Sequence, residues 1–371
     1  MPRKYILAGG GTSGHINPAL AIADEIKRRE PDADILFCGT ARGLESEMVP
    51  RAGYKFQEIR ARGLPGKPGL EMIKAIREIM AGRKQCLKLL RSFKPDAVIG
   101  TGGYVCSPLI SAAAHLKVPA LLHEQNAYPG RSNRVMAGRC QSICVSFPGT
   151  ERFFRTSAPV VLTGNPVREI FFQLNRKQAR QELGIDEDQK LVLIMGGSLG
   201  AARLNSAVLG LAENDVWTSF ANLNGNVRLI LAAGKQHFAA VSEAAEKPGL
   251  VCDVREYLFD AHLWMAAADL VIARAGAMTC SELTALGRAS VLIPYPYAAG
   301  DHQTFNASVL VEAGAAIMQR DELCSSAWLS EILVEMLSDP SKLTLMGEAA
   351  GRLARPQAAG DIYTCLEGIV K

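Results

Sequence analysis

Three glycine-rich segments each follow a short apolar run in the sequence. Residues 9–14 read GGGTSG, residues 100–103 read GTGG, and residues 196–200 read GGSLG. Because glycine has no Cβ atom, backbone amides in such a loop can approach a phosphate at the start of the following helix. A single loop of this kind would most simply be a tight turn. Three loops that each follow a predicted strand favour a ligand site at the carboxyl ends of parallel strands.

The first loop also satisfies the Gly-x-Gly-x-x-Gly pattern of proteins that bind dinucleotides. Such proteins hold the ribose of NAD with an acidic residue at the end of the second strand. Here the second predicted strand, residues 35–38, is followed by Gly39 and Thr40 and brings no carboxylate. We therefore do not expect NAD, and we expect no other cofactor.

A further polar cluster, residues 274–282, follows the apolar run 270–273. Its small residues predict a turn that opens a helix, and the first amides of that helix could hold a diphosphate. Glu282 could then accept hydrogen bonds from a ribose diol. The alternative is a capping box, in which Thr279 caps the helix and Glu282 closes the box three residues later. Residues 301–306, after the next predicted strand, would contact sugar hydroxyls or form a solvated first turn.

Histidine suits general acid–base chemistry near neutral pH. His15 closes the first glycine loop, and His123 ends a predicted strand beside Glu124. For the removal of a proton from a substrate, His15 is our first candidate, and Glu124 or His123 is the second. The alternative for His15 is a hydrogen bond from the start of the helix to a bound ligand.

The elements that must position these residues form two similar halves. An apolar run, a glycine loop and a helical stretch occur first in residues 4–29 and again in residues 191–211. Short apolar runs alternate with helical stretches in both halves, which predicts a parallel sheet with helices on both faces, built twice. We expect domains over residues 1–163 and 164–338, and a helical segment, 339–371, that packs back toward the first domain. The other predicted strands are residues 35–38, 97–99, 120–123, 228–232, 251–255, 270–273 and 290–293.

Composition is that of an ordinary globular protein with two cores. The chain has 371 residues, of which 48% are hydrophobic and 21% charged, and a single core rarely grows beyond about 250–300 residues. The nine cysteines are scattered without a CxxC pair, so we expect free thiols and no metal site. No uncharged apolar run reaches the length of a spanning helix, and no signal peptide is evident. We therefore expect a protein of the cytoplasm.

Together these motifs resemble the MurG family, the N-acetylglucosaminyltransferases of bacterial peptidoglycan synthesis. Two positions depart from the family pattern: Ser13, where many relatives have glycine, and His302, where some have glutamine. The resemblance implies the GT-B fold, in which two Rossmann-like, doubly wound parallel-sheet domains face a cleft and the second holds most of the donor. The matching stretches are residues 9–15, 102–104, 123–126, 164–168, 196–198, 274–282 and 302–303.

The resemblance implies an inverting transfer of GlcNAc from UDP-GlcNAc to the 4-hydroxyl of MurNAc in undecaprenyl-diphospho-MurNAc-pentapeptide (lipid I), which gives lipid II and UDP. His15 or Glu124 would be the catalytic base. The resemblance implies that Ser198 and Arg168 lie near the diphosphate and uridine, and that Leu258 contacts the uracil through its backbone. Ala277, Met278 and Thr279 would form the phosphate turn, Glu282 would bind the ribose, and Gln303 would bind the GlcNAc hydroxyls. From the first domain, Thr12, Ser13, Gly14 and Asn126 would lie over the donor sugar. For Leu258, the alternative is an ordinary core leucine.

Two other functions share the fold: a UDP-GlcNAc 2-epimerase, which needs no acceptor, and a silent nucleotide-binding module that docks on membranes. Residues 60–94 hold ten basic and two acidic side chains. With the apolar side chains between Leu64 and Met80, they predict peripheral docking on the anionic, cytoplasmic face of the cell membrane. The alternative is that Ile73 and Ile76 pack on the sheet. We expect no nucleic-acid partner, and the family allows association with other cell-wall enzymes.

Overall fold

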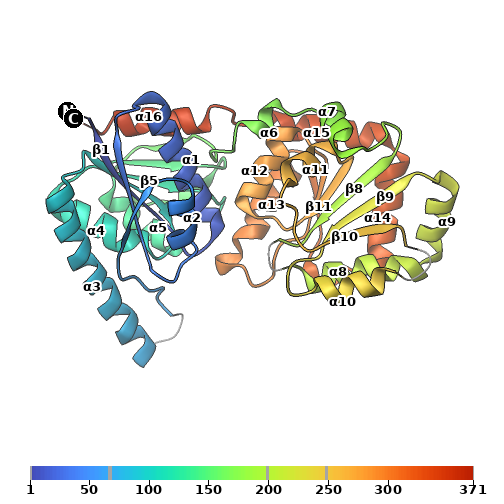
Figure 1. Ribbon diagram of the computed structural model, residues 1–371, viewed down its shortest axis with the longest axis horizontal. Helices are drawn as coiled ribbons and strands as arrows, with labels where there is room; N and C mark the ends of the chain where they lie inside the picture. Colours follow the sequence, from blue (N-terminus) through green and yellow to red (C-terminus); the bar gives the residue numbers. More distant parts are fainter. Residues whose placement is uncertain (1, 66–68, 198–199, 247–249, 371) are drawn as a thin grey trace. The chain divides into compact units, whose positions relative to one another are not determined.

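The structure, a computed structural model, describes residues 2–65, 69–197, 200–246 and 250–370. The chain divides into two compact units (Figure 1). Unit 1 consists of residues 1–167 and 355–371, and unit 2 of residues 168–354. Each unit is built on its own parallel sheet, as the two similar halves of the sequence predict.

The sheet of unit 1 has seven parallel strands in the order β3-β2-β1-β4-β5-β6-β7. Strands buried on both faces must be apolar throughout, which is why the runs in β1, β4 and β5 are continuous rather than alternating. The strands are β1 (Lys4–Gly9), β2 (Asp34–Gly39), β3 (Lys55–Glu58), β4 (Ala97–Gly102), β5 (Ala120–Glu124), β6 (Ser142–Val145) and β7 (Val160–Leu162).

Helices cover both faces of this sheet. Successive side chains of β1 point to opposite faces, so that Tyr5 and Leu7 pack with α1 and α16, whereas Ile6 packs with α3 and α4. The helices of unit 1 are α1 (Ser13–Arg29), α2 (Glu45–Arg51), α3 (Leu70–Phe93), α4 (Cys106–Leu116), α5 (Arg131–Met136) and α16 (Ala358–Glu367).

Helix α3 differs from the other helices of unit 1 because its first half leaves the core. Figure 1 shows this half extending past the sheet. Ile73 is 51% exposed and Ile76 45%, so the alternative in which these two side chains pack on the sheet is wrong. The residues of α3 that are buried begin at Ala75 and lie mainly in its second half. None of the described helices is long and apolar enough to cross a membrane.

The sheet of unit 2 has six parallel strands in the order β10-β9-β8-β11-β12-β13. Counted within the unit, this is the order 3-2-1-4-5-6 of a doubly wound Rossmann sheet. The strands are β8 (Lys190–Met195), β9 (Val227–Ala232), β10 (Cys252–Arg255), β11 (Leu270–Ala273), β12 (Ser290–Leu292) and β13 (Ala316–Met318). The helices are α6 (Ile170–Gln173), α7 (Arg176–Leu183), α8 (Ala202–Leu209), α9 (Asp215–Asn224), α10 (Phe238–Ala245), α11 (Ala261–Ala267), α12 (Ala277–Leu286), α13 (His302–Glu312), α14 (Ser326–Ser338) and α15 (Pro340–Arg352).

The segment 339–371, expected as one helical piece, is divided between the units. Helix α15 packs on α12 in unit 2, where a Cβ atom on Gly347 would come within 2.6 Å of the carbonyl oxygen of Gly287. Helix α16 packs on α1 in unit 1, and the Tyr363 hydroxyl donates a hydrogen bond to Glu30 at 2.7 Å. Only the second of these helices returns to the first domain. The first boundary lies between residues 167 and 168, four residues later than expected.

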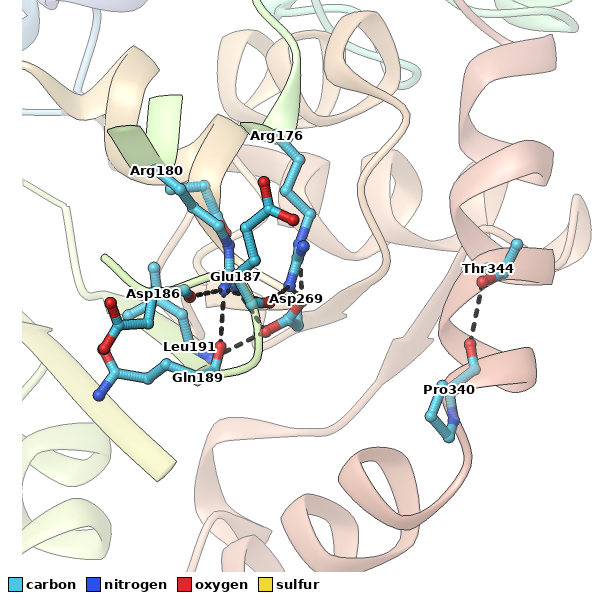
Figure 2. A network of polar contacts seen from close by, with 10 residues as sticks. Arg176, Arg180, Asp186, Glu187, Gln189, Leu191, Asp269, Pro340 and Thr344 are labelled. Carbon is cyan, nitrogen blue, oxygen red and sulfur yellow. Dashed lines mark hydrogen bonds and ion pairs between the residues drawn. The ribbon is translucent and has the colours of Figure 1, made fainter. Parts of the chain in front are cut away.

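A buried charge cluster closes the end of the unit 2 sheet at which β8 and β11 begin (Figure 2). The fully buried Arg180 donates to Asp269 at 2.8 Å and to four backbone carbonyls at 2.7–3.2 Å. Asp269 also accepts the amide of Leu191 at 2.8 Å and the Arg176 guanidinium at 2.9 Å. Because these bonds connect α7 to the sheet at the end opposite the carboxyl ends of the strands, we interpret the role of the cluster as structural.

Candidate functional site

In unit 1 two glycine loops meet beyond the ends of β1 and β4. Gly102 and Gly103 have φ values of 108° and 77°, which side chains with a Cβ atom rarely adopt. A Cβ atom on Gly103 would also overlap the carbonyl oxygen of Gly10. The register shifts here, because Ala8 opposes Gly100 whereas Gly9 opposes Gly102. The skipped residue, Thr101, thereby turns its carbonyl toward His15.

His15 is held by one nitrogen of its ring. Its Nδ1 atom lies 2.8 Å from Oε1 of Gln125 and 3.1 Å from the carbonyl oxygen of Thr101. No described residue hydrogen-bonds Nε2, and the side chain is half-buried. The structure therefore places the first candidate base at the end of the sheet with one ring nitrogen anchored.

Glu124 is fully buried, and both of its carboxylate oxygens are occupied. Oε1 accepts the amide and the side chain of Asn126 at 2.9 and 3.1 Å. Oε2 accepts the amide of Gly130 at 3.0 Å and the side chain of Asn133 at 2.8 Å. This geometry gives Glu124 the role of orienting Asn126 and the start of α5, and it does not support Glu124 as the base.

His123, the other candidate base, is also fully buried. Its Nδ1 accepts a hydrogen bond from Gln125 at 2.8 Å, and its Nε2 lies 3.1 Å from the carbonyl oxygen of Gly164. Burial lowers the pKa of His123 to about 4, so the ring is neutral near pH 7. With both nitrogens bonded within the protein, His123 has no position from which to take a proton from a substrate.

Glu45 is a residue of this site that the sequence analysis missed. Its buried carboxylate accepts the amide of Gly11 at 3.1 Å, the amide of Thr40 at 3.0 Å and the hydroxyl of Thr40 at 2.8 Å. A Cβ atom on Gly10 would lie within 2.9 Å of this carboxylate. A negative group of the protein itself therefore fills the concave side of the first glycine loop.

The other predicted residues of unit 1 lie around this loop. Thr12 is the N-cap of α1, and its side chain makes no capping hydrogen bond. The amides of Ser13 and Gly14 are in the first turn of the helix, where the helix supplies no acceptor. Thr12 and Ser13 are exposed, whereas Gly14 and Asn126 are half-buried. The structure thus brings Thr12, Ser13, Gly14 and Asn126 to the same end of the sheet as His15.

In unit 2 the helix after β11 begins at Ala277, with Gly276 as its N-cap. Its first three amides belong to Ala277, Met278 and Thr279, and such amides form an anion-binding end. Thr279 is the third residue of the helix and caps nothing, so the capping-box alternative is wrong. This result leaves Glu282 free of a role at the helix start.

Glu282 lies one turn into α12, near Arg168. Burial raises the pKa of Glu282 to about 7, and the positive charge of Arg168 opposes this shift. No described residue hydrogen-bonds the Glu282 carboxylate. Arg168 itself is exposed, and its guanidinium stacks over Phe171 of α6 at 5.3 Å. A buried carboxylate whose charge is offset by few neighbouring positive charges or hydrogen bonds is a common feature of ligand sites.

Asn306 and Arg274 stabilise the turn between β11 and α12 through hydrogen bonds and an ion pair. The side chain of Asn306 in α13 donates to the carbonyl of Ala275 at 3.1 Å. Arg274 binds Asp321 at 2.6 Å and the carbonyls of Ile293 and Pro294 at 3.1 and 3.2 Å. Arg274, part of the polar cluster in the sequence, is therefore structural.

The side-chain amide of Gln303 is hydrogen-bonded within the protein through its oxygen. Its Oε1 accepts the backbone amide of Tyr295 at 2.9 Å, so the orientation of the side chain is fixed and the NH₂ group can donate to a ligand. His302, the position that departs from the family pattern, has its Nδ1 atom 2.8 Å from the carbonyl oxygen of Ala299.

The predicted donor contacts of Leu258 and Ser198 both stay predictions. The side chain of Leu258 is 6% exposed, as the core alternative expects, yet it lies between the exposed Tyr257 and Phe259. No described residue hydrogen-bonds its backbone, so the proposed backbone contact stays open. Ser198 lies outside the described residues. Within the described part of the chain, no three His, Cys, Asp or Glu side chains are placed to hold a metal ion.

Comparisons with known proteins connect these features to a family. Residues 5–145 match the glycosyltransferase family 28 N-terminal domain, and residues 191–362 match the glycosyltransferase family 28 C-terminal domain. The chain belongs to glycosyltransferase family 28. Two curated relatives, from Acetivibrio thermocellus and Desulforudis audaxviator, are 41% and 43% identical and cover 98–99% of both chains. Each is named a UDP-N-acetylglucosamine–N-acetylmuramyl-(pentapeptide) pyrophosphoryl-undecaprenol N-acetylglucosamine transferase.

Solved structures confirm the predicted fold class. The crystal structure of Acinetobacter baumannii MurG is similar with a TM-score of 0.79 and 28% identity, covering 99% of this chain and all of that one. This family 28 chain therefore has the GT-B fold, with two Rossmann-like parallel-sheet domains. A UDP-GlcNAc 2-epimerase from Neisseria meningitidis is similar with a TM-score of 0.69 but 13% identity, over 99% of this chain and all of that one, which shows a shared fold alone.

Proposed function

We propose that this protein transfers GlcNAc from UDP-GlcNAc to the 4-hydroxyl of MurNAc in undecaprenyl-diphospho-MurNAc-pentapeptide, giving lipid II and UDP. The observation that carries the proposal is a sequence identity of 38–43%, along nearly the whole chain, to transferases that bear this activity in their names. The epimerases are only 13–14% identical. They share the fold, and fold alone does not assign a function.

Unit 2 holds the donor in this proposal. The amides of Ala277, Met278 and Thr279 bind the diphosphate, the Glu282 carboxylate accepts both ribose hydroxyls, and the Gln303 NH₂ group donates to the GlcNAc. When the sugar leaves, negative charge develops on UDP. The start of α12 and Arg168 are fixed positive groups that stabilise this charge. Ser198 and the backbone of Leu258 complete the donor contacts.

Unit 1 supplies the acceptor side and the base. The acceptor 4-hydroxyl oxygen bonds to the anomeric carbon of GlcNAc while the bond from that carbon to the UDP oxygen breaks, and the electron pair stays on UDP. Nε2 of His15 takes the hydroxyl proton. Thr12, Ser13, Gly14 and Asn126, at the same end of the sheet, position the sugars. A single displacement of this kind inverts the anomeric configuration.

Acceptor-dependent release of UDP tests the reaction. UDP is measured with UDP-GlcNAc alone and after the addition of a lipid-linked MurNAc-pentapeptide diphosphate. Release that requires the acceptor, with a β-linked product from the α-linked donor, supports the transferase. Turnover without acceptor indicates the epimerase, and no turnover in either condition indicates a silent binding module. Either of these two results contradicts the proposal.

Replacement of His15 tests the base. His15→Ala should lower kcat about a hundredfold or more, because a general base contributes about 10²–10⁴ to the rate. Binding of UDP-GlcNAc, measured by calorimetry, should change little, because most of the proposed donor contacts lie in unit 2. His115→Ala, on the exposed end of α4, is the control. Near-normal turnover of His15→Ala at saturating substrates would exclude His15.

The first half of α3 is proposed as the surface that docks on the anionic, cytoplasmic face of the cell membrane. Leu70, Ile73 and Met80 are 77%, 51% and 66% exposed. Lys74 and Arg77 are exposed among them, and Lys74 is paired with Glu71 at 2.8 Å. Exposed apolar side chains within a basic rim suit the interface of anionic lipids. An acceptor that is anchored in lipid must be met at this surface.

Charge reversal tests the docking. Lys74→Glu with Arg77→Glu should weaken binding to vesicles that contain phosphatidylglycerol, most strongly at low salt. The control is Lys88→Glu with Arg91→Glu, which makes the same charge change on the second half of the same helix. Equal binding of the two double variants would contradict the proposal. Lys67, part of the predicted basic group, lies outside the described residues and is left unchanged.

A further inference from the structure

A chain of four hydrogen-bonding groups connects His15 to the backbone of unit 1. Nδ1 of His15 contacts Oε1 of Gln125 at 2.8 Å, and Nε2 of Gln125 contacts Nδ1 of His123 at 2.8 Å. Nε2 of His123 then contacts the carbonyl oxygen of Gly164 at 3.1 Å. Gln125 and His123 are both buried, 1% and 0% exposed. The chain is therefore shielded from water and must satisfy its own donors and acceptors.

The two ends of this chain determine its direction, because a backbone carbonyl can only accept. The carbonyl of Thr101 lies 3.1 Å from Nδ1 of His15, so this nitrogen must carry the proton. The carbonyl of Gly164 requires a proton on Nε2 of His123, which is neutral and so leaves its Nδ1 as an acceptor. Gln125 between them then accepts from His15 through its oxygen and donates to His123 through its NH₂ group.

The opposite orientation of the Gln125 amide fails at both ends. Its NH₂ group would face Nδ1 of His15, which would have to give up its proton and point a lone pair at the Thr101 carbonyl. The oxygen of the Gln125 amide would face His123, which would then have to carry its proton on Nδ1. A lone pair of Nε2 of His123 would point at the carbonyl oxygen of Gly164. Buried lone pairs that face each other are costly.

Neighbouring groups fit the first orientation. The Ser146 hydroxyl lies 3.3 Å from Nε2 of His123 and can accept from it while donating to the carbonyl of Glu124 at 2.7 Å. The side chain of Asn165 donates to the carbonyl of Gln125 at 3.1 Å and fixes its backbone. Every contact along the chain from His15 through Gln125 and His123 to Gly164 then joins a donor to an acceptor.

We propose that Gln125, oriented by the buried and neutral His123, is a positioning residue that holds His15 in the tautomer protonated on Nδ1. The lone pair of His15 is then on Nε2, the ring nitrogen that no described residue occupies. After this atom takes a proton, Nδ1–H still donates to Gln125 and Thr101, so the imidazolium is stabilised without rearrangement. The catalytic consequence rests on the proposed function, whereas the tautomer does not.

The tautomer is measured directly in the unaltered protein. With ¹⁵N-labelled histidine, long-range ¹H–¹⁵N spectra at about pH 8 distinguish a protonated from an unprotonated ring nitrogen, and His15→Gln identifies the signals of His15. We expect Nδ1 protonated and Nε2 unprotonated. Protonation on Nε2 would overturn the inference even if the enzyme transfers GlcNAc normally. If the tautomer is as expected but His15→Ala retains full turnover, His15 is excluded as the catalytic base. The inference about the tautomer is then still supported.

Gln125→Met tests the positioning role, since methionine has a similar length and lacks the amide. Thr101 is then the remaining acceptor at Nδ1, so the fraction of His15 protonated on Nε2 should rise without becoming complete. The value of kcat should fall about tenfold or more, while KM for UDP-GlcNAc changes less than about twofold. Gln57→Met, at an exposed glutamine of β3, should leave both unchanged. A folded Gln125→Met variant with an unaltered tautomer and kcat would overturn the proposal. If this variant does not fold, the tautomer of the unaltered protein decides.

Discussion

The carboxylate of Glu45 lies inside the first glycine loop and accepts the amide hydrogen of Gly11 at 3.1 Å. In a dinucleotide-binding domain an amide of this loop would face a phosphate. Here the negative charge belongs to the protein. A second anion beside Glu45 would be repelled, which gives a structural reason against NAD at this loop. It also shows what fixes the loop that carries His15 into α1.

Removal of the Glu45 side chain should destabilise unit 1. Glu45→Ala leaves the amides of Gly11 and Thr40 without their charged acceptor, at an expected cost of about 2–4 kcal/mol in the free energy of unfolding. Transfer activity should fall as well, because the loop next to His15 loses its support. Urea denaturation measures the stability. Glu47→Ala, at the exposed partner of Arg51 in the same helix, is the control and should cost less than about 1 kcal/mol. Equal costs would contradict this role.

Local patterns predicted most of the central strands and missed two edge strands, β3 and β13. β1, β8 and β11 are buried on both faces, so that their sequences are continuously apolar and recognisable. The edge strand β3 reads KFQE, and β13 has three residues. An edge strand pairs on one side only and leaves little apolar pattern to detect.

The same distinction applies to the site. The glycine loops and the start of α12 follow directly from strand, turn and helix signals. Glu45 is 34 residues from Gly11 and resembles any acidic residue in the first turn of a helix. Gln125 and His123 are neighbours of His15 only because β5 lies beside β4 in the sheet. The tertiary fold, which no local pattern contains, creates these contacts.

Glu282 should make the unliganded protein less stable as the pH rises. Burial raises its pKa to about 7 in the folded state, against an ordinary value near 4.3. Between these two values the unfolded state ionises first, so the folded state loses stability as pH increases and the loss is complete above about pH 7. Glu282→Gln should therefore raise Tm at pH 8 and have little effect at pH 4.5.

Binding of UDP should show the opposite preference. The ionised carboxylate accepts two ribose hydroxyls, so UDP affinity should fall as the pH drops below about 7, and binding should release a proton. Calorimetry in buffers of different ionisation enthalpy measures that release. Glu282→Gln should lose affinity and its pH dependence together. A variant that binds UDP as tightly as the unaltered protein would contradict the ribose contact.

The cluster around Arg180 should matter for stability and leave chemistry alone. Asp269→Ala removes the carboxylate that pairs with the fully buried Arg180 and should cost about 3–5 kcal/mol. Glu187→Ala removes the exposed partner of Lys177, 3.4 Å away, and should cost less than about 1 kcal/mol. Turnover per folded molecule should be unchanged in both variants, because the cluster lies opposite the carboxyl ends of the strands. A loss of turnover in folded Asp269→Ala would show that the cluster contributes to the site.

Transfer should proceed without a divalent metal ion. Asp32 and Asp34 resemble the Asp-x-Asp motif of metal-dependent transferases, but they lie at the start of β2, whereas the glycine loops follow the carboxyl ends of the strands. Asp34 is also paired with Lys55 at 2.8 Å. The charge that develops on UDP must then be stabilised by the start of α12 and by Arg168. Arg168→Ala should lower kcat about tenfold to a hundredfold, whereas Asp34→Ala should leave it unchanged. Loss of activity with EDTA, restored only by a divalent ion, would contradict this mechanism.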